Sequence, residues 1–364
     1  MSGQSQFKLL QQRRFAPFFV TQFLGALNDN VFRNGLVILI TFQGIVVAGM
    51  DHTQLANVAA GLFILPYFLF SATAGQLADK YEKSMLIRRV KLLEIGLMVV
   101  ASAALVTGSY ALLLLVLFFM GLQSTMFGPV MYAYLPQQLA EDELIGGNAL
   151  VESGTYIAII LGLIAGGIAV GDEIATVLGV SKQAVLSACL VGVAVFGYLA
   201  SRQIPVTRAV DPDLRINWNA WQETWHIVQY AREERSVFLS ILGISWFWFY
   251  GSAMTIQIPA YTLDILNGSE SITTFLLAAF AVGVGIGSLL CERLSGHRIE
   301  LGLVPFGAIG MSWFAMDLYF ANPDAHAVAA TTIAEFLARP GGARIWFDLV
   351  MIGAFGGFYS VPLY

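Results

Sequence analysis

Long apolar runs separated by short polar connections make up most of this chain. A helix needs about 20 apolar residues to cross a bilayer, and ten runs approach or exceed that length. They cover residues 17–48, 54–77, 88–107, 110–134, 148–170, 184–201, 237–263, 272–294, 301–321 and 345–364. The pattern predicts an all-α polytopic membrane protein with about ten transmembrane helices.

Two connections, 202–236 and 322–344, are longer than the rest. The first carries aromatic and apolar residues spaced by charges, which predicts an amphipathic helix near the membrane surface. These residues are Trp218, Trp221, Trp225, Val228 and Tyr230. We expect a cytoplasmic linker over 202–236, between a six-helix half over 1–201 and a second half over 237–364. The second half is expected to be incomplete after about four helices, because Tyr364 lies inside an apolar run.

The composition excludes several classes of protein. Apolar and aromatic residues make up 57% of the chain and charged residues 12%, whereas soluble domains carry roughly 25% charged residues. A soluble enzyme and a disordered chain are therefore excluded. A net charge of −5 without a basic tract gives no site for nucleic acid. Cys189 and Cys291 form no metal spacing, so we expect no metal or cofactor.

The positive charges predict the orientation in the membrane. Most of the 19 Lys and Arg residues fall in the N-terminal segment and in alternate connections. These positions include Lys8, Arg13, Arg14, the stretch 80–91, the linker, Arg293 and Arg298. Because cytoplasmic connections carry the excess of positive charge, the N-terminus and the linker are predicted to be cytoplasmic.

Two motifs of the first half recur in the second. GQLADKYEKS (75–84) is echoed by GSLLCERLSG (287–296), and GLQSTMFGPVMY (121–132) by GAFGGFYSVPLY (353–364). In the second pair Gly121 matches Gly353. The common order predicts a duplicated six-helix unit, which places a substrate cavity between the halves near the bilayer midplane.

The loop after the second predicted span resembles a motif of the major facilitator superfamily. The matching residues are Gly75, Leu77, Ala78, Asp79, Lys80 and Lys83. Glu82 departs from the motif, because the family usually has glycine there. The resemblance implies the major facilitator fold of two six-helix repeats. It also implies a conformational gate at Gly75, Asp79, Lys80 and Lys83, with the Asp79 carboxylate against a helix end of the other half.

The first predicted span contains a dense polar cluster of Asn28, Asp29, Asn30, Arg33 and Asn34. An ionised side chain at the bilayer centre costs at least about 2.5–3.5 kcal/mol. Asp29 and Arg33 are four residues apart, so they share a helix face and can pair. Such a pair could lock the helix to its neighbours or bind a zwitterionic group. We favour the binding site, because neutral hydrogen bonds would fasten helices at a lower desolvation cost.

Three further residues complete the candidate substrate site: Tyr132, Glu152 and Gln257. Glu152, near the start of the fifth span, faces either the cavity or the cytoplasmic interface. Gln257 interrupts the seventh span, which Gly251 and Pro259 are expected to break. A break would free backbone groups to line a cavity.

Six motifs indicate a particular family within the superfamily that the chain resembles. In chain order they are FLGALNDNVFRNGLVILITF, GQLADKYEKS, FGPVMYAYLPQQL, GNALVESGTYIA, LGISWFWFYGS and GFYSVPLY. Over essentially the whole chain they resemble the lysophospholipid transporter family. The similarity is greatest to the transporter portion of fusions that continue into a glycerophospholipid acyltransferase and an acyl-acyl carrier protein (acyl-ACP) synthetase.

The resemblance implies a membrane transporter, not an enzyme. By alternating access it would move lysophospholipid, chiefly lysophosphatidylethanolamine, to the cytoplasmic leaflet of a bacterial inner membrane for re-acylation. Membrane lipid and a fused or associated acyltransferase/acyl-ACP synthetase are the implied partners. Met131 and Gln257 stand where family members often carry cations, which shifts phosphate binding to Arg33.

Three alternatives fit parts of the pattern. A proton-coupled facilitator-type exporter of amphipathic compounds would use Asp29 or Glu152 as its protonated carboxyl. A membrane acyltransferase would need a His followed five positions later by Asp. None of the four His residues has this spacing, so catalytic domains could only follow in a larger fusion. A degenerate carrier serving as an anchor or receptor is the third.

Overall fold

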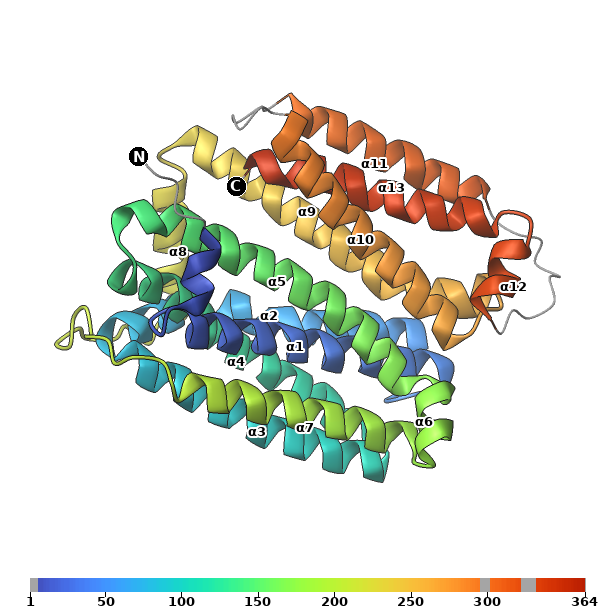
Figure 1. Ribbon diagram of the computed structural model, residues 1–364, viewed down its shortest axis with the longest axis horizontal. Helices are drawn as coiled ribbons and strands as arrows, with labels where there is room; N and C mark the ends of the chain where they lie inside the picture. Colours follow the sequence, from blue (N-terminus) through green and yellow to red (C-terminus); the bar gives the residue numbers. More distant parts are fainter. Residues whose placement is uncertain (1–5, 295–301, 322–331, 364) are drawn as a thin grey trace. The chain divides into compact units, whose positions relative to one another are not determined.

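A computed structural model describes residues 6–294, 302–321 and 332–363 (Figure 1). The regular elements in these residues are all helices, which confirms the predicted all-α fold. The long helices are α1 (Ala16–Phe42), α2 (His52–Lys80), α3 (Lys83–Thr107), α4 (Tyr110–Gln138), α5 (Glu141–Val170), α7 (Lys182–Ser201), α9 (Arg235–Ala260), α10 (Glu270–Leu294), α11 (Leu303–Phe320) and α13 (Gly342–Ser360). The short ones are η1 (Gln6–Gln11), α6 (Asp172–Leu178), α8 (Ala220–Ala231), η2 (Tyr261–Ile265), α12 (Ile333–Ala338) and η3 (Val361–Leu363).

Nine helices in the described ranges are long and apolar enough to cross a membrane. The helix α1 is not among them, because its polar cluster lowers its mean hydropathy. Its 27 residues are nevertheless long enough to cross a bilayer, since they extend about 40 Å at 1.5 Å per residue. The first predicted span was too long, since α1 ends at Phe42 and not at residue 48. Gly44 and Gly49 follow with positive φ, a conformation that favours glycine and ends the helix.

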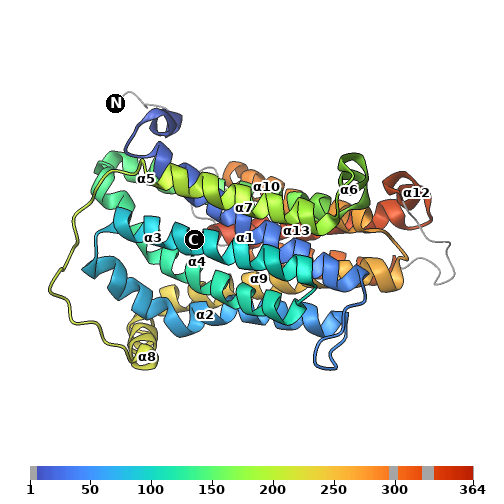
Figure 2. The ribbon, with the colours of Figure 1, turned by 90° about the horizontal axis from the view of Figure 1, so that it is seen from below.

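The chain folds as two compact units. The first consists of residues 1–36 and 58–228, and the second of residues 37–57 and 229–364. The first unit therefore contains most of α1, all of α3, α4, α5 and α7, and the connection that follows α7. Within it α7 runs beside α3, and in the second unit α13 packs on both α10 and α11 (Figures 1 and 2).

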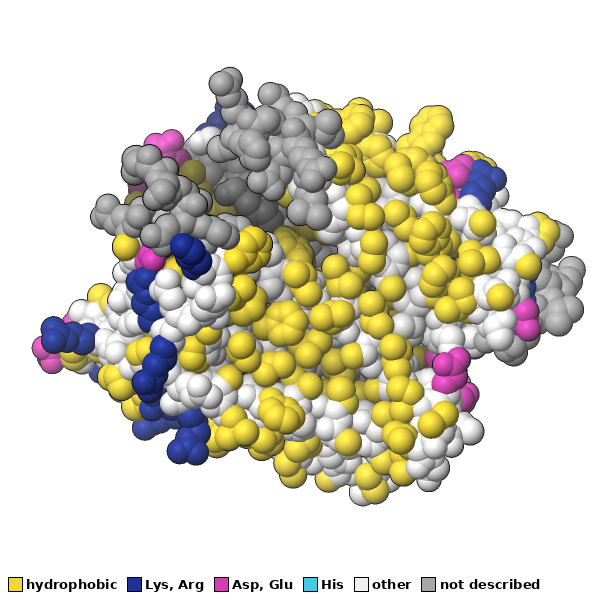
Figure 3. Space-filling model, viewed as in Figure 1, with side chains coloured by type: hydrophobic (Ala, Val, Ile, Leu, Met, Phe, Trp, Pro, Cys, Tyr) yellow, Lys and Arg dark blue, Asp and Glu magenta, His cyan; other side chains and the backbone are white. Residues whose placement is uncertain are grey.

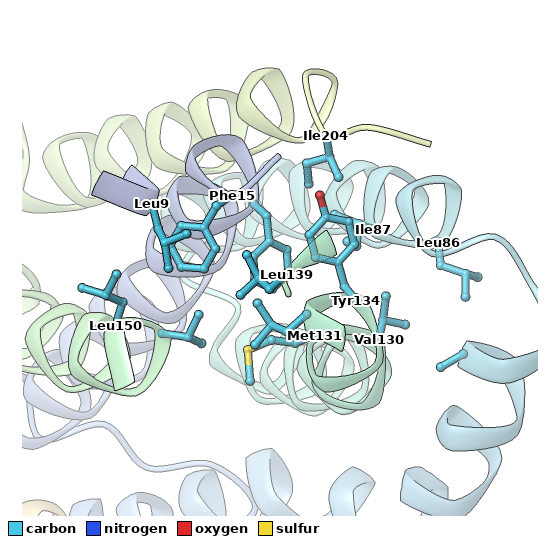
Figure 4. Packing of buried hydrophobic residues seen from close by; sticks show 14 residues of the cluster. Leu9, Phe15, Leu86, Ile87, Val130, Met131, Tyr134, Leu139, Leu150 and Ile204 are labelled. Carbon is cyan, nitrogen blue, oxygen red and sulfur yellow. The ribbon is translucent and has the colours of Figure 1, made fainter. Parts of the chain in front are cut away.

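Buried apolar side chains from η1, α1, α3, α4 and α5 gather at one end of the first unit (Figure 4). Tyr134 is fully buried there, and its ring stacks on Phe18 at a centroid distance of 4.5 Å. Its hydroxyl donates to the backbone oxygen of Arg14 at 2.8 Å. Arg14 in turn pairs with Glu143 at 2.6 Å. These contacts fix α1 against α4 and α5, and so position the polar cluster of α1.

Two glycines that the repeat aligns make the same kind of contact in separate units. A methyl group at Gly121 of α4 would overlap the backbone oxygen of Phe63 in α2. A methyl group at Gly353 of α13 would overlap the backbone oxygen of Phe280 in α10. Small residues allow this close approach of helix backbones. Each unit therefore joins two of its long helices through a glycine at a matching position.

The predicted amphipathic helix in the linker is present as α8. Its Trp221 and Tyr230 side chains are exposed, and the edge of the Trp221 ring meets Phe68 of α2 at a centroid distance of 5.7 Å. Lys and Arg side chains gather at the end of the first unit where the linker runs (Figure 3). Exposed tryptophan beside positive charge favours a location at the membrane interface.

Replacing Gly121 by Ala tests the backbone contact between α4 and α2. Because the new methyl group meets a carbonyl oxygen that no side-chain rotation can move, we expect a loss of about 1–3 kcal/mol. Gly96 of α3 is the control, because a methyl group there meets open space and should stabilise the helix by up to about 1 kcal/mol. Thermal unfolding in detergent measures both. Equal melting temperatures for the two variants would contradict the contact.

Candidate functional site

The polar residues of α1 meet α3 and α4 inside the first unit. Asn28 is fully buried and donates from Nδ2 to Oε1 of Glu94 at 2.9 Å. Asp29 accepts a hydrogen bond through Oδ2 from the hydroxyl of Ser124. The sequence prediction of a polar site on α1 is thereby extended to side chains of two further helices.

Glu94 is the centre of this cluster. Its Oε2 lies 2.6 Å from Nζ of Lys91, and each side chain of the pair is 1% exposed. Gln123 of α4 donates to the same oxygen at 3.2 Å. Lys91 also lies over the ring of Phe127, with Nζ 5.6 Å from the centroid. With Asn28 on the other oxygen, Glu94 receives three donors from three helices.

Lys91 was wrongly placed among the charges of the cytoplasmic loop. The helix α3 begins at Lys83, so Lys91 lies two turns inside it. The sequence does contain a signal for this buried pair. Lys91 and Glu94 are three residues apart at the start of an apolar run, and side chains at that spacing lie on one helix face. Gln123 and Ser124 were missed because neutral polar residues in a span are common and their direction depends on the turn of α4.

Arg33 and Asp29 have different partners, and the direct pair that their spacing suggested is not formed. Arg33 donates to Oδ1 of Asn30 at 2.8 Å, and its guanidinium carbon lies 5.4 Å from the centroid of the Phe63 ring. Spacing by four residues makes the two side chains neighbours on α1, but partners on α2 and α4 turn them apart. Asn34 donates to the backbone oxygen of Leu163 at 2.7 Å and so joins α1 to α5.

The other predicted substrate residues lie elsewhere. Tyr132 of α4 is 56% exposed. Gln257 of α9 belongs to the second unit and donates to Oδ1 of Asn57 at 3.1 Å. The predicted break at Gly251 is wrong, because α9 continues to Ala260 and changes to a π-helix only at η2. A glycine costs a helix only about 1 kcal/mol, which is too little to break α9.

Several residues used in the predictions lie outside what the structure describes. These are the side chains of Glu152 and Arg293, together with Arg298 and Tyr364.

The predicted gate loop holds the start of the linker. The backbone oxygen of Asp79 accepts from the amides of Val210 and Asp211, both at 3.0 Å. Lys80 donates from Nζ to the backbone oxygen of Leu214 at 2.9 Å. The Asp79 side chain is exposed, and a methyl group at Gly75 would meet open space. Lys83 is fully buried. The loop is therefore a binding surface for the linker within the first unit.

Glu82, the departure from the family motif, caps α3. Its carboxylate accepts from the amides of Ser84 and Met85, both at 2.7 Å. It also accepts from the amide and the hydroxyl of Thr207 in the linker, both at 2.9 Å. Burial of Glu82 raises the pKa of its carboxyl, but the hydrogen bonds from Thr207 and Ser84 outweigh it and hold that pKa below its usual value.

The sequence profile of the Major Facilitator Superfamily matches residues 18–364. The chain belongs to this superfamily. This membership confirms the predicted superfamily. It also confirms the prediction that the chain is a multi-pass membrane transporter and not an enzyme.

Relatives of this facilitator carry a more specific name. The lysophospholipid transporter LplT of Cronobacter sakazakii is 26% identical over 355 residues, which cover 97% of this chain and 80% of that protein. The lysophospholipid transporter LplT of Escherichia coli O157:H7 is 25% identical over 356 residues, which cover 94% of this chain and 77% of that protein.

Solved structures show the same superfamily fold. A bacterial homologue of the human lysosomal transporter Spinster, inward-facing and unoccupied, has a TM-score of 0.66 at 14% identity, over 97% of this chain and 74% of that chain. The nucleoside transporter NupG has a TM-score of 0.62 at 10% identity, over 95% of this chain and 81% of that chain. At these identities the likeness establishes the fold.

Replacing Lys91 by Met tests the buried pair. The variant leaves the buried Glu94 carboxyl without a cation beside it, so we expect a loss of about 3–5 kcal/mol. Lys182→Met is the control, because its partner Asp172 is 77% exposed and such pairs contribute about 0–1 kcal/mol. Adding Glu94→Gln to Lys91→Met should recover much of the loss. Chemical denaturation in detergent measures all three, and equal losses for the two single variants would contradict a buried pair.

Replacing Glu82 by Gln tests the cap on α3. The variant should lose about 0.5–2 kcal/mol. Because the folded pKa of Glu82 lies below its usual 4.5, the carboxylate stabilises the fold above about pH 4.5, and this contribution is lost as the pH falls through the folded pKa. The variant should lack this part of the acid sensitivity, whereas Asp213→Asn in the exposed linker should retain it. The free energy of unfolding, measured between pH 7 and pH 3, tests this prediction. If it falls in parallel with pH for the wild type and for Glu82→Gln, the cap is ruled out.

Proposed function

We propose that this protein transports lysophospholipids, chiefly lysophosphatidylethanolamine, across a bacterial inner membrane to the cytoplasmic leaflet. Transport would proceed by alternating access, with the N-terminus and the linker in the cytoplasm. The names of its relatives support the substrate class. The excess of positive charge in alternate connections supports the orientation. Re-acylation by a fused or associated acyltransferase/acyl-ACP synthetase would consume the transported lipid.

The observation that carries the proposal is the state of Arg33. Among the residues that the structure describes, Arg33 donates its hydrogen bond to the neutral Asn30 and lies over the Phe63 ring, whereas Asp29 acts on it electrostatically without forming a salt bridge. A cation inside a membrane helix that forms no salt bridge is costly. A phosphate supplies that partner, and guanidinium binds phosphate through charge-assisted, bidentate hydrogen bonds. The ammonium of the same headgroup would pair with the nearby carboxyl of Asp29.

The acyl tail needs apolar surface. Within the second unit by itself, α9 carries exposed aromatic side chains, where Trp246 stacks on Tyr250 at a centroid distance of 5.4 Å. Tyr359 of α13 meets the same Trp246 ring at 5.4 Å. We assign the tail to the surrounding lipid, reached through a lateral gap between helices.

Replacing Asp29 by Asn tests the headgroup site. The change keeps the shape of the side chain but removes a charge-assisted contact of about 1.5–3 kcal/mol, so uptake should fall about 10- to 100-fold. The measurement is entry of labelled lysophosphatidylethanolamine into cells that lack their own transporter. Asp172→Asn, a change at an exposed carboxylate, is the control and should transport normally.

Equal membrane expression must be shown for both variants by quantitative blotting. Normal uptake by Asp29→Asn would contradict the proposed role of Asp29 in binding the headgroup. Absence of uptake by the wild-type chain, in spite of confirmed membrane insertion, would refute lysophospholipid transport and favour an exporter of amphipathic compounds.

A further inference from the structure

The hydroxyl of Ser124 lies among the side-chain oxygens of Asp29, Gln123 and Tyr67, and Tyr67 can donate its own proton to it. The Ser124 Oγ contacts Oδ2 of Asp29 and, at 3.0 Å, Oε1 of Gln123. The orientation of Gln123 is fixed, because its Nε2 donates to Glu94 at 3.2 Å and its oxygen must face Ser124. A serine hydroxyl carries a single proton. It therefore cannot donate a full hydrogen bond to both Asp29 and Gln123.

A proton on Asp29 supplies the missing donor. Asp29 Oδ2 then donates to Ser124, Ser124 to Gln123, and Gln123 to Glu94. The second carboxyl oxygen of Asp29, Oδ1, is buried and accepts no hydrogen bond from the described residues. This environment suits the carbonyl oxygen of a neutral acid, whereas a carboxylate oxygen would lose its hydration without replacement. Hydrogen-bond counting thus places the proton on Asp29.

Among the residues that the structure describes, four charged or titratable side chains face Asp29. They are Arg33 of α1, Tyr67 of α2, and Lys91 and Glu94 of α3. The charges of Lys91 and Glu94 cancel at 2.6 Å, and Tyr67 is neutral. With a proton on Asp29, the group therefore carries the single positive charge of Arg33. This excess charge attracts a phosphate before any ammonium is bound.

We propose that Asp29 holds a proton while the site is empty and exchanges it for the ammonium group of an incoming lysophospholipid. The inference rests on the function proposed above and adds a proton as the ion exchanged. The O–H bond of the acid breaks, the proton passes to water, and the carboxylate pairs with the ammonium. The Ser124 hydroxyl then turns from Gln123 to Asp29.

The exchange balances the charges of the site. A bound phosphoethanolamine brings one phosphate to Arg33 and one ammonium to Asp29, so the loss of one proton leaves the group and its ligand neutral. A lysophospholipid without an ammonium pairs with Arg33 alone and leaves the proton on Asp29. The two lipid classes should therefore differ in their response to pH.

Proton release on binding tests the exchange. The purified full chain in weakly buffered detergent, with a pH indicator, receives short-chain lysophosphatidylethanolamine below its critical micelle concentration, at several values between pH 5 and pH 8. At the acid end of this range we expect about one proton to be released for each lipid bound. The affinity there should fall up to tenfold for each unit by which the pH is lowered. Lysophosphatidylglycerol, which has the phosphate but no ammonium, should release none and bind with a flat pH profile.

Two variants complete the test. Asp29→Asn should bind either lipid without proton release. Ser124→Ala, which removes the link between Asp29 and Gln123, should shift the pH at which release begins, whereas Ser102→Ala, whose hydroxyl donates to the α3 backbone, should not. Binding of both lipids with the same flat pH profile and no proton release overturns the exchange and leaves the proposed function standing. Failure of the wild-type chain to bind either lipid overturns both.

Discussion

The ion pair between Lys91 and Glu94 is the constraint on which the site depends. A buried carboxylate is costly unless its oxygens receive hydrogen bonds, and Glu94 receives them from Lys91, Asn28 and Gln123. These donors belong to α3, α1 and α4, so the need to satisfy one charge fixes three helices against one another. Asp29 is adjacent to Asn28 in the chain, and its place beside Ser124 follows from that arrangement.

The sequence was most informative where a polar residue lies within an apolar run. Charged and amide side chains in the apolar run of α1 stand out because a membrane helix excludes them unless they face protein or water. Asp29 and Asn28 were found in this way. Gln123 and Ser124 were not, because a hydroxyl or an amide costs little in a span. Their importance depends on which face α4 turns toward Asp29, and periodicity cannot supply that in a helix that is apolar all round.

Spacing along one helix was a weaker guide to partners. Asp29 and Arg33 occupy the positions of an ion pair, but a side chain in a bundle also meets residues of neighbouring helices, and these decide the outcome. For Arg33 the alternatives are Asn30 and the ring of Phe63. The internal repeat concerned equivalent positions in the two halves, and its aligned glycines make the same kind of contact. Gly121 and its counterpart in the second unit both lie where only a residue without a side chain fits.

The helix α3 connects the linker to the polar cluster. Its first turn is capped by Glu82, which also holds Thr207 of the linker. Glu94 lies twelve residues further along, about 18 Å at 1.5 Å per residue, and the helix between them is continuous. The glutamate that departs from the family motif thus joins the linker to the helix that carries Glu94, through contacts to Thr207 that a glycine, without a side chain, could not make.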